Sequence, residues 1–207
     1  MLESERGGSG VENETITSSD TLRSNRVPPG QHLVDHLPVL HYSKVPRIET
    51  GVWRLAVSGL VARPVALTYD QFQALPRSKV FCDIHCVTTW STLGHTWEGV
   101  RTVSLRNVVE VLPAARFVTV KSYDGYSTNL PIDEFFDEDV ILATDLDGKE
   151  LSKDYGWPVR LVVPKIYFWK SAKWVSGIEF MERDRPGFWE TRGYHNHGDP
   201  WKEERYG

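Results

Sequence analysis

The large apolar residues of this chain fall into short runs separated by turn residues, and this pattern constrains the fold more than any other feature. Residues 52–59 alternate large apolar side chains with others, as a strand does, and end at Gly59. Asp-Gly dipeptides at 124–125 and 147–148 are typical of tight turns, so each predicts a hairpin. About seven or eight strand segments, two to four short helices and no regular βαβ alternation can be distinguished. We therefore predict a mixed, strand-rich α+β domain.

Two helices are predicted among these strands. Thr68 has a side chain suited to a helix cap and begins a short helix that ends before Pro76. Residues 102–112 form the second predicted helix, because their apolar residues recur at helical spacing. Residues 88–99 are predicted to be a loop. The remaining strands are predicted at 79–87, 116–123, 126–132, 140–146, 149–152, 159–164 and 171–181.

One domain with a polar segment at each end is predicted. Residues 1–26 have almost no large apolar side chains, so they are expected to be a disordered N-terminal tail. Residues 27–193 form the domain, and its first part, 27–47, holds four prolines and is expected to be an extended arm that lines a site. Residues 194–207 are a polar C-terminal tail. This tail is expected to pack back onto the body, to cover the site or to contact another subunit.

Composition and charge argue against several classes of partner. The 207 residues include 24 Lys and Arg against 28 Asp and Glu, which gives a net charge of −4. Binding to nucleic acid or to a membrane surface would favour a clustered basic surplus, so neither partner is expected. No apolar run approaches the roughly 18 residues of a membrane span, and residues 1–20 show no readable export signal. We therefore expect a cytoplasmic protein with Cys82 and Cys86 as free thiols.

Cys86 is the first candidate for chemistry. It lies at the predicted end of a buried strand, where a thiolate can act as a nucleophile or a metal ligand. The alternative is that Cys82 and Cys86 are small apolar fillers of the core. A zinc site of Cys82, His85 and Cys86 lacks the usual second half, which His195 and His197 would have to supply.

A second candidate stretch combines cations with aromatic residues near the end of the domain. Arg160 begins a predicted strand, and Lys170 and Lys173 follow the aromatic residues 167–169. Arginine and lysine in such positions suit a phosphorylated cofactor, because the guanidinium binds phosphate in a bidentate manner. The alternative is that these are surface charges whose stems cover apolar rings.

Together these stretches resemble the oxidoreductase domain of the sulfite oxidase family, which carries molybdenum on a pyranopterin. The resemblance covers 27–193 and rests on several motifs in the family's order. They are PVLHY at 38–42, WRLAVSGLVARPVALTYDQFQALP at 53–76, HCVTTWS at 85–91, DGYSTNLPI at 124–132, ILATDLDGKELSKDYGWPVRLVVP at 141–164 and YFWKSAKWVSGIEF at 167–180. HCVTTWS is more similar to the catalytic subunit of bacterial periplasmic methionine sulfoxide reductases than to true sulfite oxidases. The resemblance implies a molybdopterin-binding fold.

The resemblance also implies roles for individual residues. Cys86 is implied to be the thiolate ligand of molybdenum, and a soft anionic sulfur suits a metal already held by the sulfurs of its cofactor. Tyr126 corresponds to a tyrosine near the metal, so it is a second candidate catalytic residue. Arg160 is implied to bind the cofactor phosphate. The other residues implied to bind the cofactor are His41, Tyr42, Ser43, His85, Tyr155, Phe168, Trp169, Lys170 and Lys173.

Two positions depart from the family pattern. Relatives usually have Gly at the position of Phe168, and a Cβ there obstructs close backbone approach or forces a different φ. The arginines that hold sulfite in relatives are missing after Cys86, because residues 87–91 are neutral. The cofactor loop and the substrate are therefore expected to differ from those of sulfite oxidases.

The leading hypothesis is a molybdenum-molybdopterin oxidoreductase that moves an oxygen atom to or from a small substrate such as sulfite, a sulfoxide or an N-oxide. A separate electron-transfer partner is expected, because oxygen transfer changes the metal by two electrons. One alternative is a cysteine- or zinc-dependent enzyme in which Cys86 and His85 act without pterin. Another is a non-catalytic module that kept the fold, for which Phe168 is the best argument.

Overall fold

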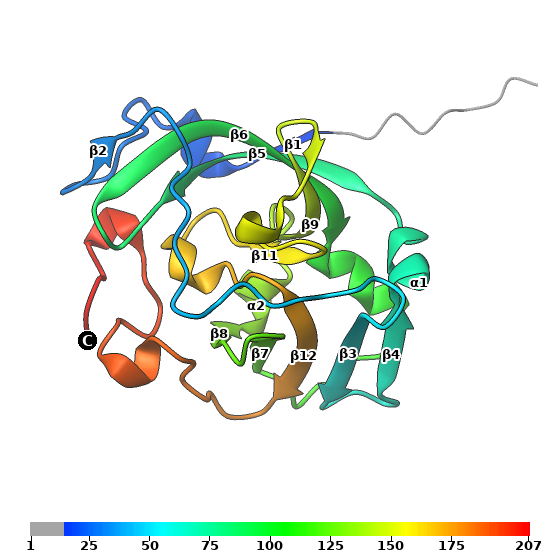
Figure 1. The fold of residues 1–207 in the computed structure, drawn as a ribbon. Coiled ribbons are helices and arrows are strands. Elements are labelled where there is room, and N and C mark those ends of the chain that lie inside the picture. The colour runs from blue at the N-terminus through cyan, green and yellow to red at the C-terminus, as the bar shows by residue number, and fades with distance from the viewer. Residues whose placement is uncertain (1–14) are drawn as a thin grey trace, which may run out of the picture.

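The computed structural model describes residues 15–207, and residues 1–14 lie outside the described part. Its body consists of two β-sheets connected by loops and short helices (Figure 1). In this view the first sheet lies above the second, and the segment that links β11 to β12 lies between them. The predicted mixed, strand-rich α+β class is therefore confirmed.

The first sheet has seven strands and is built on the long antiparallel pair β5 and β6. β9 pairs antiparallel with β6, and both β10 and β11 pair antiparallel with β9. β1 and β2 add parallel to β5 and β6. The strands are β1 (Thr15–Thr17), β2 (His32–Leu33), β5 (Ser78–His85), β6 (Trp90–Arg101), β9 (Ile141–Leu146), β10 (Lys149–Glu150) and β11 (Arg160–Val162).

The second sheet has five strands in the order β4-β3-β12-β7-β8. β12 pairs parallel with β3, and every other pair in this sheet is antiparallel. The predicted hairpin at residues 124–125 is confirmed as the turn between β7 and β8. The strands are β3 (Arg54–Gly59), β4 (Val65–Thr68), β7 (Phe117–Ser122), β8 (Ser127–Pro131) and β12 (Val175–Met181).

The prediction of a loop at 88–99 is wrong, because most of this segment belongs to the twelve-residue strand β6. Its Thr, Ser and Gly residues hide the strand pattern, yet Trp90 and Trp97 are buried on it. Pairing with β5 on one side and β9 on the other satisfies the backbone of this polar segment. A tight turn at residues 86–89 connects β5 to β6, and Thr89 adopts a φ of 76° there.

The helices are short. α1 (Tyr69–Gln73) begins at Thr68, whose hydroxyl accepts from the N–H of Gln71 in a capping box, so the first predicted helix is confirmed. The second prediction is wrong in type and length, because residues 102–112 contain only the 3-10 helix η2 (Thr102–Asn107). Four valines in this segment weaken an α-helix. The other short helices are η1 (Ser19–Leu22), α2 (Ile132–Phe135), η3 (Lys153–Tyr155), η4 (Phe168–Lys170), η5 (Glu190–Arg192) and η6 (Pro200–Lys202).

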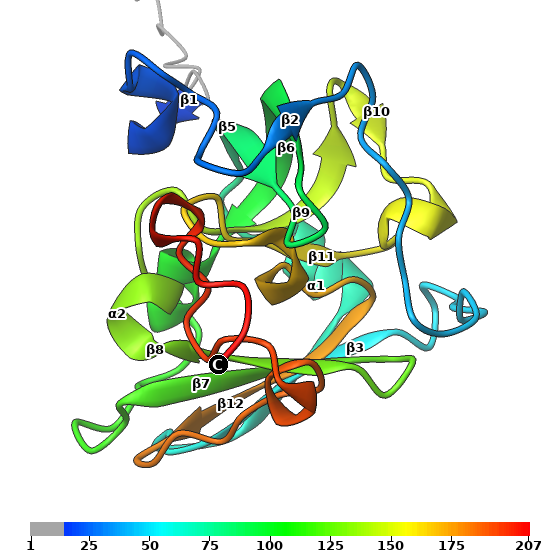
Figure 2. The same ribbon diagram turned by 90° about the vertical axis from the view of Figure 1, so that its left-hand side faces the viewer.

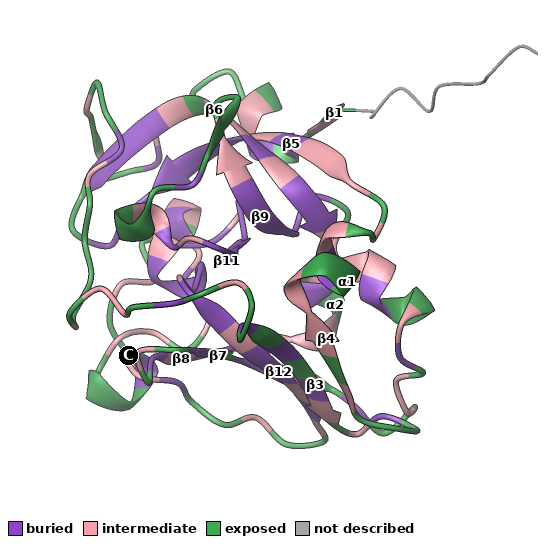
Figure 3. Ribbon diagram, turned by 45° about the vertical axis from the view of Figure 1, so that its right-hand side comes forward, coloured by how far each residue is buried: buried purple, intermediate pink, exposed green. Residues whose placement is uncertain are grey.

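Two apolar clusters form the core. The larger cluster contains Trp53 and the inward-facing Leu55 and Val57 of β3 and extends to β7, β12 and α2. The smaller cluster lies along β5, β6 and β9 and includes Trp97 and Tyr167. Figure 3 shows buried positions on β5, β6, β9, β7 and β12. No helix of the described chain is long and apolar enough to cross a membrane.

The terminal segments are packed onto the body. The predicted disordered tail differs from the structure from Thr15 onward, since β1 pairs with residues 79–81 of β5. Residues 1–14 of that prediction lie outside the described residues. The C-terminal segment 194–207 packs back, and the Trp201 indole N–H donates to Asp20. Figure 2 shows this red segment beside the loops that join the two sheets.

Candidate functional site

A cavity of about 300 Å³ is lined by loops from both sheets, by the arm and by the C-terminal region. Nine of the twelve candidate residues line it, and Ser43, His85 and Lys170 do not. The nine are His41, Tyr42, Cys86, Tyr126, Tyr155, Arg160, Phe168, Trp169 and Lys173. Residues that the sequence places more than a hundred positions apart therefore share one site.

Cys86 reaches the cavity from the tight turn after β5. Its backbone N–H donates to the carbonyl of Trp90 at 2.9 Å, and its carbonyl accepts from Thr89 at 3.0 Å. The Sγ atom lies 3.2 Å from the hydroxyl of Thr88. Burial raises the pKa of the Cys86 thiol. A bound metal ion reverses that effect by deprotonating the thiol, so this position suits a metal ligand.

Arg160 is a buried cation without a counterion in the described chain. It begins β11, its side chain is 1% exposed, and burial lowers its pKa to about 9. The guanidinium donates to three backbone carbonyls, those of Tyr155 at 2.9 Å, Ser171 at 3.1 Å and Leu161 at 3.5 Å. Arginine has five N–H donors, so two remain for a ligand.

Lys173 lies beside Arg160 in the same cavity. Burial lowers its pKa to about 7, and the Arg160 charge contributes in the same direction. Its ammonium donates to the carbonyl of Asp154 at 2.6 Å. Gly156, at a φ of 112°, permits this arrangement, because a Cβ there would lie 2.9 Å from Arg160 Cβ and 3.1 Å from Lys173 Cβ. Asp124 also lines the cavity, and Asp124 and Asp154 partly offset the charge of Lys173, but neither cation forms a salt bridge with a described carboxylate. Two neighbouring cations without an ion-pair partner suit the binding of an anion.

Phe168 covers the Arg160 side chain. Its ring centroid lies 4.3 Å from the guanidinium carbon, and Trp97 approaches the same group at 5.2 Å. Trp90 meets the ring of Phe168 edge-on. Phe168 does not have a positive φ, so the residue found where relatives usually have Gly introduces no left-handed backbone here. It narrows the cavity with an aromatic wall.

The arm and the segment after β10 supply another wall. His41 packs edge-on against Trp174, with ring centroids 5.7 Å apart. The Tyr42 hydroxyl donates to the carbonyl of Asp124, and the Tyr155 hydroxyl donates to that of Leu37. Tyr42 and Tyr155 thus line the cavity with their hydroxyls already bonded.

Tyr126 lines the cavity from the β7–β8 turn, but its hydroxyl is not free. It donates to the backbone carbonyl of Trp169. Burial raises the pKa of Tyr126 well above its ordinary value. This hydrogen bond holds the loop that carries Trp169 in place, so Tyr126 has a positioning role. Its hydroxyl proton is used in this bond and is not free for a ligand.

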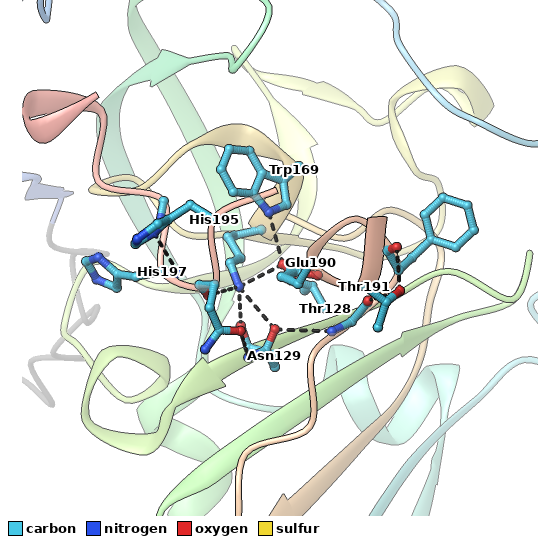
Figure 4. Close-up of polar contacts among 12 residues, drawn as sticks. Thr128, Asn129, Trp169, Glu190, Thr191, His195 and His197 are labelled. Atoms are coloured by element: carbon cyan, nitrogen blue, oxygen red, sulfur yellow. Dashed lines mark hydrogen bonds and ion pairs between the residues drawn. The ribbon is translucent and has the colours of Figure 1, made fainter. Parts of the chain in front are cut away.

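Lys170 lies behind the cavity wall, contrary to the role implied for it. Its ammonium is 2.7 Å from Glu190 and donates to the side chain and backbone of Asn129 and to the backbone of Asn196. Glu190 also accepts from the Trp169 indole at 2.9 Å (Figure 4). Both charged side chains are 1% exposed, so Lys170 is part of a buried ion pair that positions Trp169.

His85 and Ser43 also lie outside the cavity. Successive strand residues face opposite ways, so His85 turns away from the Cys86 side, with Nδ1 2.8 Å from the Ser91 hydroxyl. Burial lowers the pKa of His85 to about 4, so it is neutral near pH 7. The Ser43 hydroxyl donates to Asp124 at 2.6 Å.

The described residues contain no group of three or more His, Cys, Asp and Glu side chains arranged to bind a metal. Cys82 faces the core and is fully buried. His197 lies in the C-terminal segment, between Glu134 at 2.7 Å and Glu204 at 2.8 Å. The described residues therefore do not supply the further ligands that would complete a zinc site at Cys86.

Several cavity residues were missed by the sequence analysis, and the most informative come from the C-terminal region. Trp189 and Tyr194 line the cavity and stack on each other, with centroids 4.9 Å apart and planes at 17°. Tyr194 begins the segment predicted to be a polar tail. The density of aromatic residues from Phe188 to Trp201 was the available signal.

The chain matches the family model of the oxidoreductase molybdopterin binding domain over residues 42–189. It therefore belongs to this family of oxidoreductases, that of the sulfite oxidases. Among its relatives is the uncharacterized oxidoreductase YuiH of Bacillus subtilis, which is 44% identical over 185 residues, 89% of this chain and 93% of that protein.

Likeness to other relatives is more distant. The putative protein-methionine-sulfoxide reductase subunit YedZ1 of Azospira oryzae is 31% identical over 152 residues, 73% of this chain and 57% of that protein. The sulfane dehydrogenase SoxCD of Paracoccus pantotrophus has a similar fold. Its structure matches with a TM-score of 0.62 and 22% identity over 67% of this chain and 40% of that chain.

Proposed function

We propose that this protein binds a molybdenum-pterin cofactor in the cavity and moves an oxygen atom to or from a small uncharged substrate. The observation that carries this proposal is that Arg160 and Lys173, which form no salt bridge with a described residue, lie in the same cavity as the thiol of Cys86. The family model independently supports a molybdopterin ligand.

The residues of the cavity fit the parts of such a cofactor. The two remaining N–H groups of Arg160 and the ammonium of Lys173 would hold its phosphate. Cys86 would supply a thiolate to the metal, and the aromatic walls suit a flat ring system. When bound, the cofactor supplies two-electron oxygen-atom transfer, and the protein binds and orients the reactants.

The surroundings of Cys86 favour an uncharged substrate over sulfite. Val87, Thr88 and Trp90 line the cavity next to Cys86 and carry no charge. The two lysine and arginine side chains of the cavity are those assigned to the phosphate. The next cation, Arg205, donates to the Val87 carbonyl at 2.7 Å and does not line the cavity. An anion such as sulfite would therefore lose its hydration without direct contact with a free cation, whereas a sulfoxide or an amine N-oxide needs only a hydrogen-bond donor.

A separate electron-transfer partner completes the proposal. Oxygen transfer leaves two electrons to be supplied or removed, and we assign that step to another protein. One relative is named as a subunit of a protein-methionine-sulfoxide reductase, which is consistent with division of the reaction between two chains.

The test compares two cysteine variants in cells that make the cofactor. Cys86→Ser is expected to lower the reduction of dimethyl sulfoxide by a chemical donor at least about 100-fold, because the metal loses a direct ligand. Cys82→Ala is the matched control, since this thiol faces the core. Retained turnover in Cys86→Ser would contradict the ligand assignment. Stoichiometric zinc with thiol-dependent activity would support the cysteine or zinc enzyme instead.

A further inference from the structure

Four tyrosines line the cavity, and they differ in what their hydroxyls do. Tyr42, Tyr126 and Tyr155 each donate to a backbone carbonyl. The Tyr194 hydroxyl makes no hydrogen bond to any residue from 15 to 207, and it is not among the side-chain atoms sealed from solvent without a partner. Of the four hydroxyls, that of Tyr194 is therefore the one open to a ligand.

Tyr194 lines the same cavity as Cys86. Other polar groups near Cys86 are already committed or inaccessible. The Thr88 hydroxyl contacts Cys86 Sγ, and the unpartnered Trp90 indole N–H is sealed from solvent.

The ring of Tyr194 is held in place on three sides. It stacks on Trp189, meets the edge of Trp169 at 5.1 Å between centroids and contacts Tyr206 at 5.6 Å. Its backbone N–H donates to the carbonyl of Trp189 at 3.1 Å, and Tyr194 forms an antiparallel bridge with Tyr206. A donor whose ring is fixed in this way binds an acceptor without losing much side-chain freedom.

We propose that Tyr194 recognises the substrate, with its hydroxyl donating a hydrogen bond to the oxygen atom of an uncharged sulfoxide or amine N-oxide. This inference rests on the proposed function and adds the group that selects the substrate. In this proposal Tyr194, and not Tyr126, is the tyrosine that contacts the substrate, because the Tyr126 hydroxyl is bonded to the Trp169 carbonyl.

The test measures binding without turnover. Dimethyl sulfoxide is titrated into the oxidised holoenzyme, which cannot reduce it without a donor, and binding is followed by the fluorescence of the cavity tryptophans. Tyr194→Phe is expected to raise the Kd for dimethyl sulfoxide about two- to tenfold, as expected for one lost hydrogen bond. Tyr206→Phe is the matched control, because this exposed ring contacts Tyr194 and does not line the cavity.

Dimethyl sulfide provides a second control, since it lacks the oxygen acceptor, and it is titrated into the donor-reduced holoenzyme, which has no oxygen atom to transfer to it. Its Kd is expected to be the same for the parent protein and Tyr194→Phe, which shows that the aromatic wall is intact. An unchanged Kd for dimethyl sulfoxide in loaded Tyr194→Phe, or no binding by the loaded parent, would overturn the role of Tyr194. A parent protein without molybdenum and pterin would instead overturn the proposed function.

Discussion

Two cationic sites lie close together in the sequence but differ in what pairs with their charges, and Lys173 of the second site is only half-buried. Lys170 is paired with Glu190 at 2.7 Å and donates to Asn129 and Asn196. Arg160 and Lys173 line the cavity, and no described carboxylate forms a salt bridge with either of them, although Asp124 and Asp154 lie near Lys173. The first site has an ion-pair partner within the chain, whereas the second has none and is suited to an anion.

This difference separates a structural charge from a ligand-binding charge. A buried ion is costly unless it is paired, so the chain itself must supply Glu190 to Lys170. Burial lowers the pKa of both lysines, but Glu190 opposes the shift at Lys170, whereas the Arg160 charge adds to it at Lys173, whose pKa falls to about 7. The comparison predicts that substitutions at Lys170 affect stability and that substitutions at Arg160 and Lys173 affect ligand binding.

The largest expected effect is that of Lys170→Met. It leaves the buried Glu190 carboxylate without a cationic partner, although Trp169 and Thr128 still donate to it, and this costs about 3–5 kcal/mol in the free energy of unfolding. Chemical denaturation of the parent and the variant measures this difference. The double variant Lys170→Met, Glu190→Gln removes both charges and is expected to regain more than half of the loss. A single variant as stable as the parent would contradict the comparison.

Arg160→Met is expected to separate cofactor retention from stability. Loss of hydrogen bonds from a charged donor to the phosphate costs about 1.5–3 kcal/mol, so the cofactor affinity is expected to fall about 10- to 100-fold. The loss of folding stability in cofactor-free protein is expected to be smaller than that for Lys170→Met. Molybdenum analysis and denaturation on the same preparations measure both quantities. If Arg160→Met unfolded readily but retained its cofactor, Arg160 would be a structural charge and not a ligand-binding charge.

The ionisation of Lys173 predicts how anion binding depends on pH. With a pKa of about 7, its ammonium is charged below that pH and neutral above it. The affinity of cofactor-free protein for sulfate, whose charge is constant in this range, is therefore expected to fall about tenfold between about pH 6 and pH 8. Calorimetric titration measures this fall, and Lys173→Met is expected to remove it. A pH-independent affinity in the parent would show that Lys173 does not contact the anion.

The smallest expected effect concerns His197, which ties the C-terminal segment to α2 and lies outside both cationic sites. Hydrogen bonds to Glu134 and Glu204 raise its pKa from 6.5 to about 9. Its stabilisation is therefore complete below about pH 6.5 and is lost as the pH rises to about 9. Because His197 is one-third exposed, the contribution is expected to be at most about 1 kcal/mol.

Thermal unfolding of the parent and His197→Gln across this pH range measures that contribution. The difference in Tm between the two proteins is expected to shrink as the pH rises, because only the protonated ring pairs with both carboxylates. If the Tm difference between the parent and His197→Gln did not change with pH, the stabilisation by His197 would come from packing and not from its charge.

The sequence predicted the regular part of the fold well. Strands such as β3 and β9 could be found because apolar runs and Asp-Gly turns mark them locally. β6 was missed because its Thr, Ser and Gly residues are stabilised by pairing with β5 and β9, which a local pattern does not contain. β1 was missed for the same reason, because its pairing with β5 orders a polar segment.

Residues of the candidate site could be predicted from the sequence where a short motif contains them. They could not be predicted where contacts between distant parts of the chain determine their position. Cys86, Arg160 and Lys173 were found from motifs and line one cavity. The sequence could not show that Lys170 lies outside the cavity, because its partner, Glu190, lies twenty positions further along the chain. Tyr194 was missed because only the folded C-terminal segment brings it to the cavity that Cys86 lines.

Molybdenum, zinc and released pterin, measured on one sample purified from cells that make the cofactor, would show directly whether the cavity binds a molybdenum-pterin. The unpaired cations and the Cys86 thiol predict about one molybdenum and one pterin per chain, with no stoichiometric zinc. Zinc in place of molybdenum, or the repeated absence of both metal and pterin, would contradict the account.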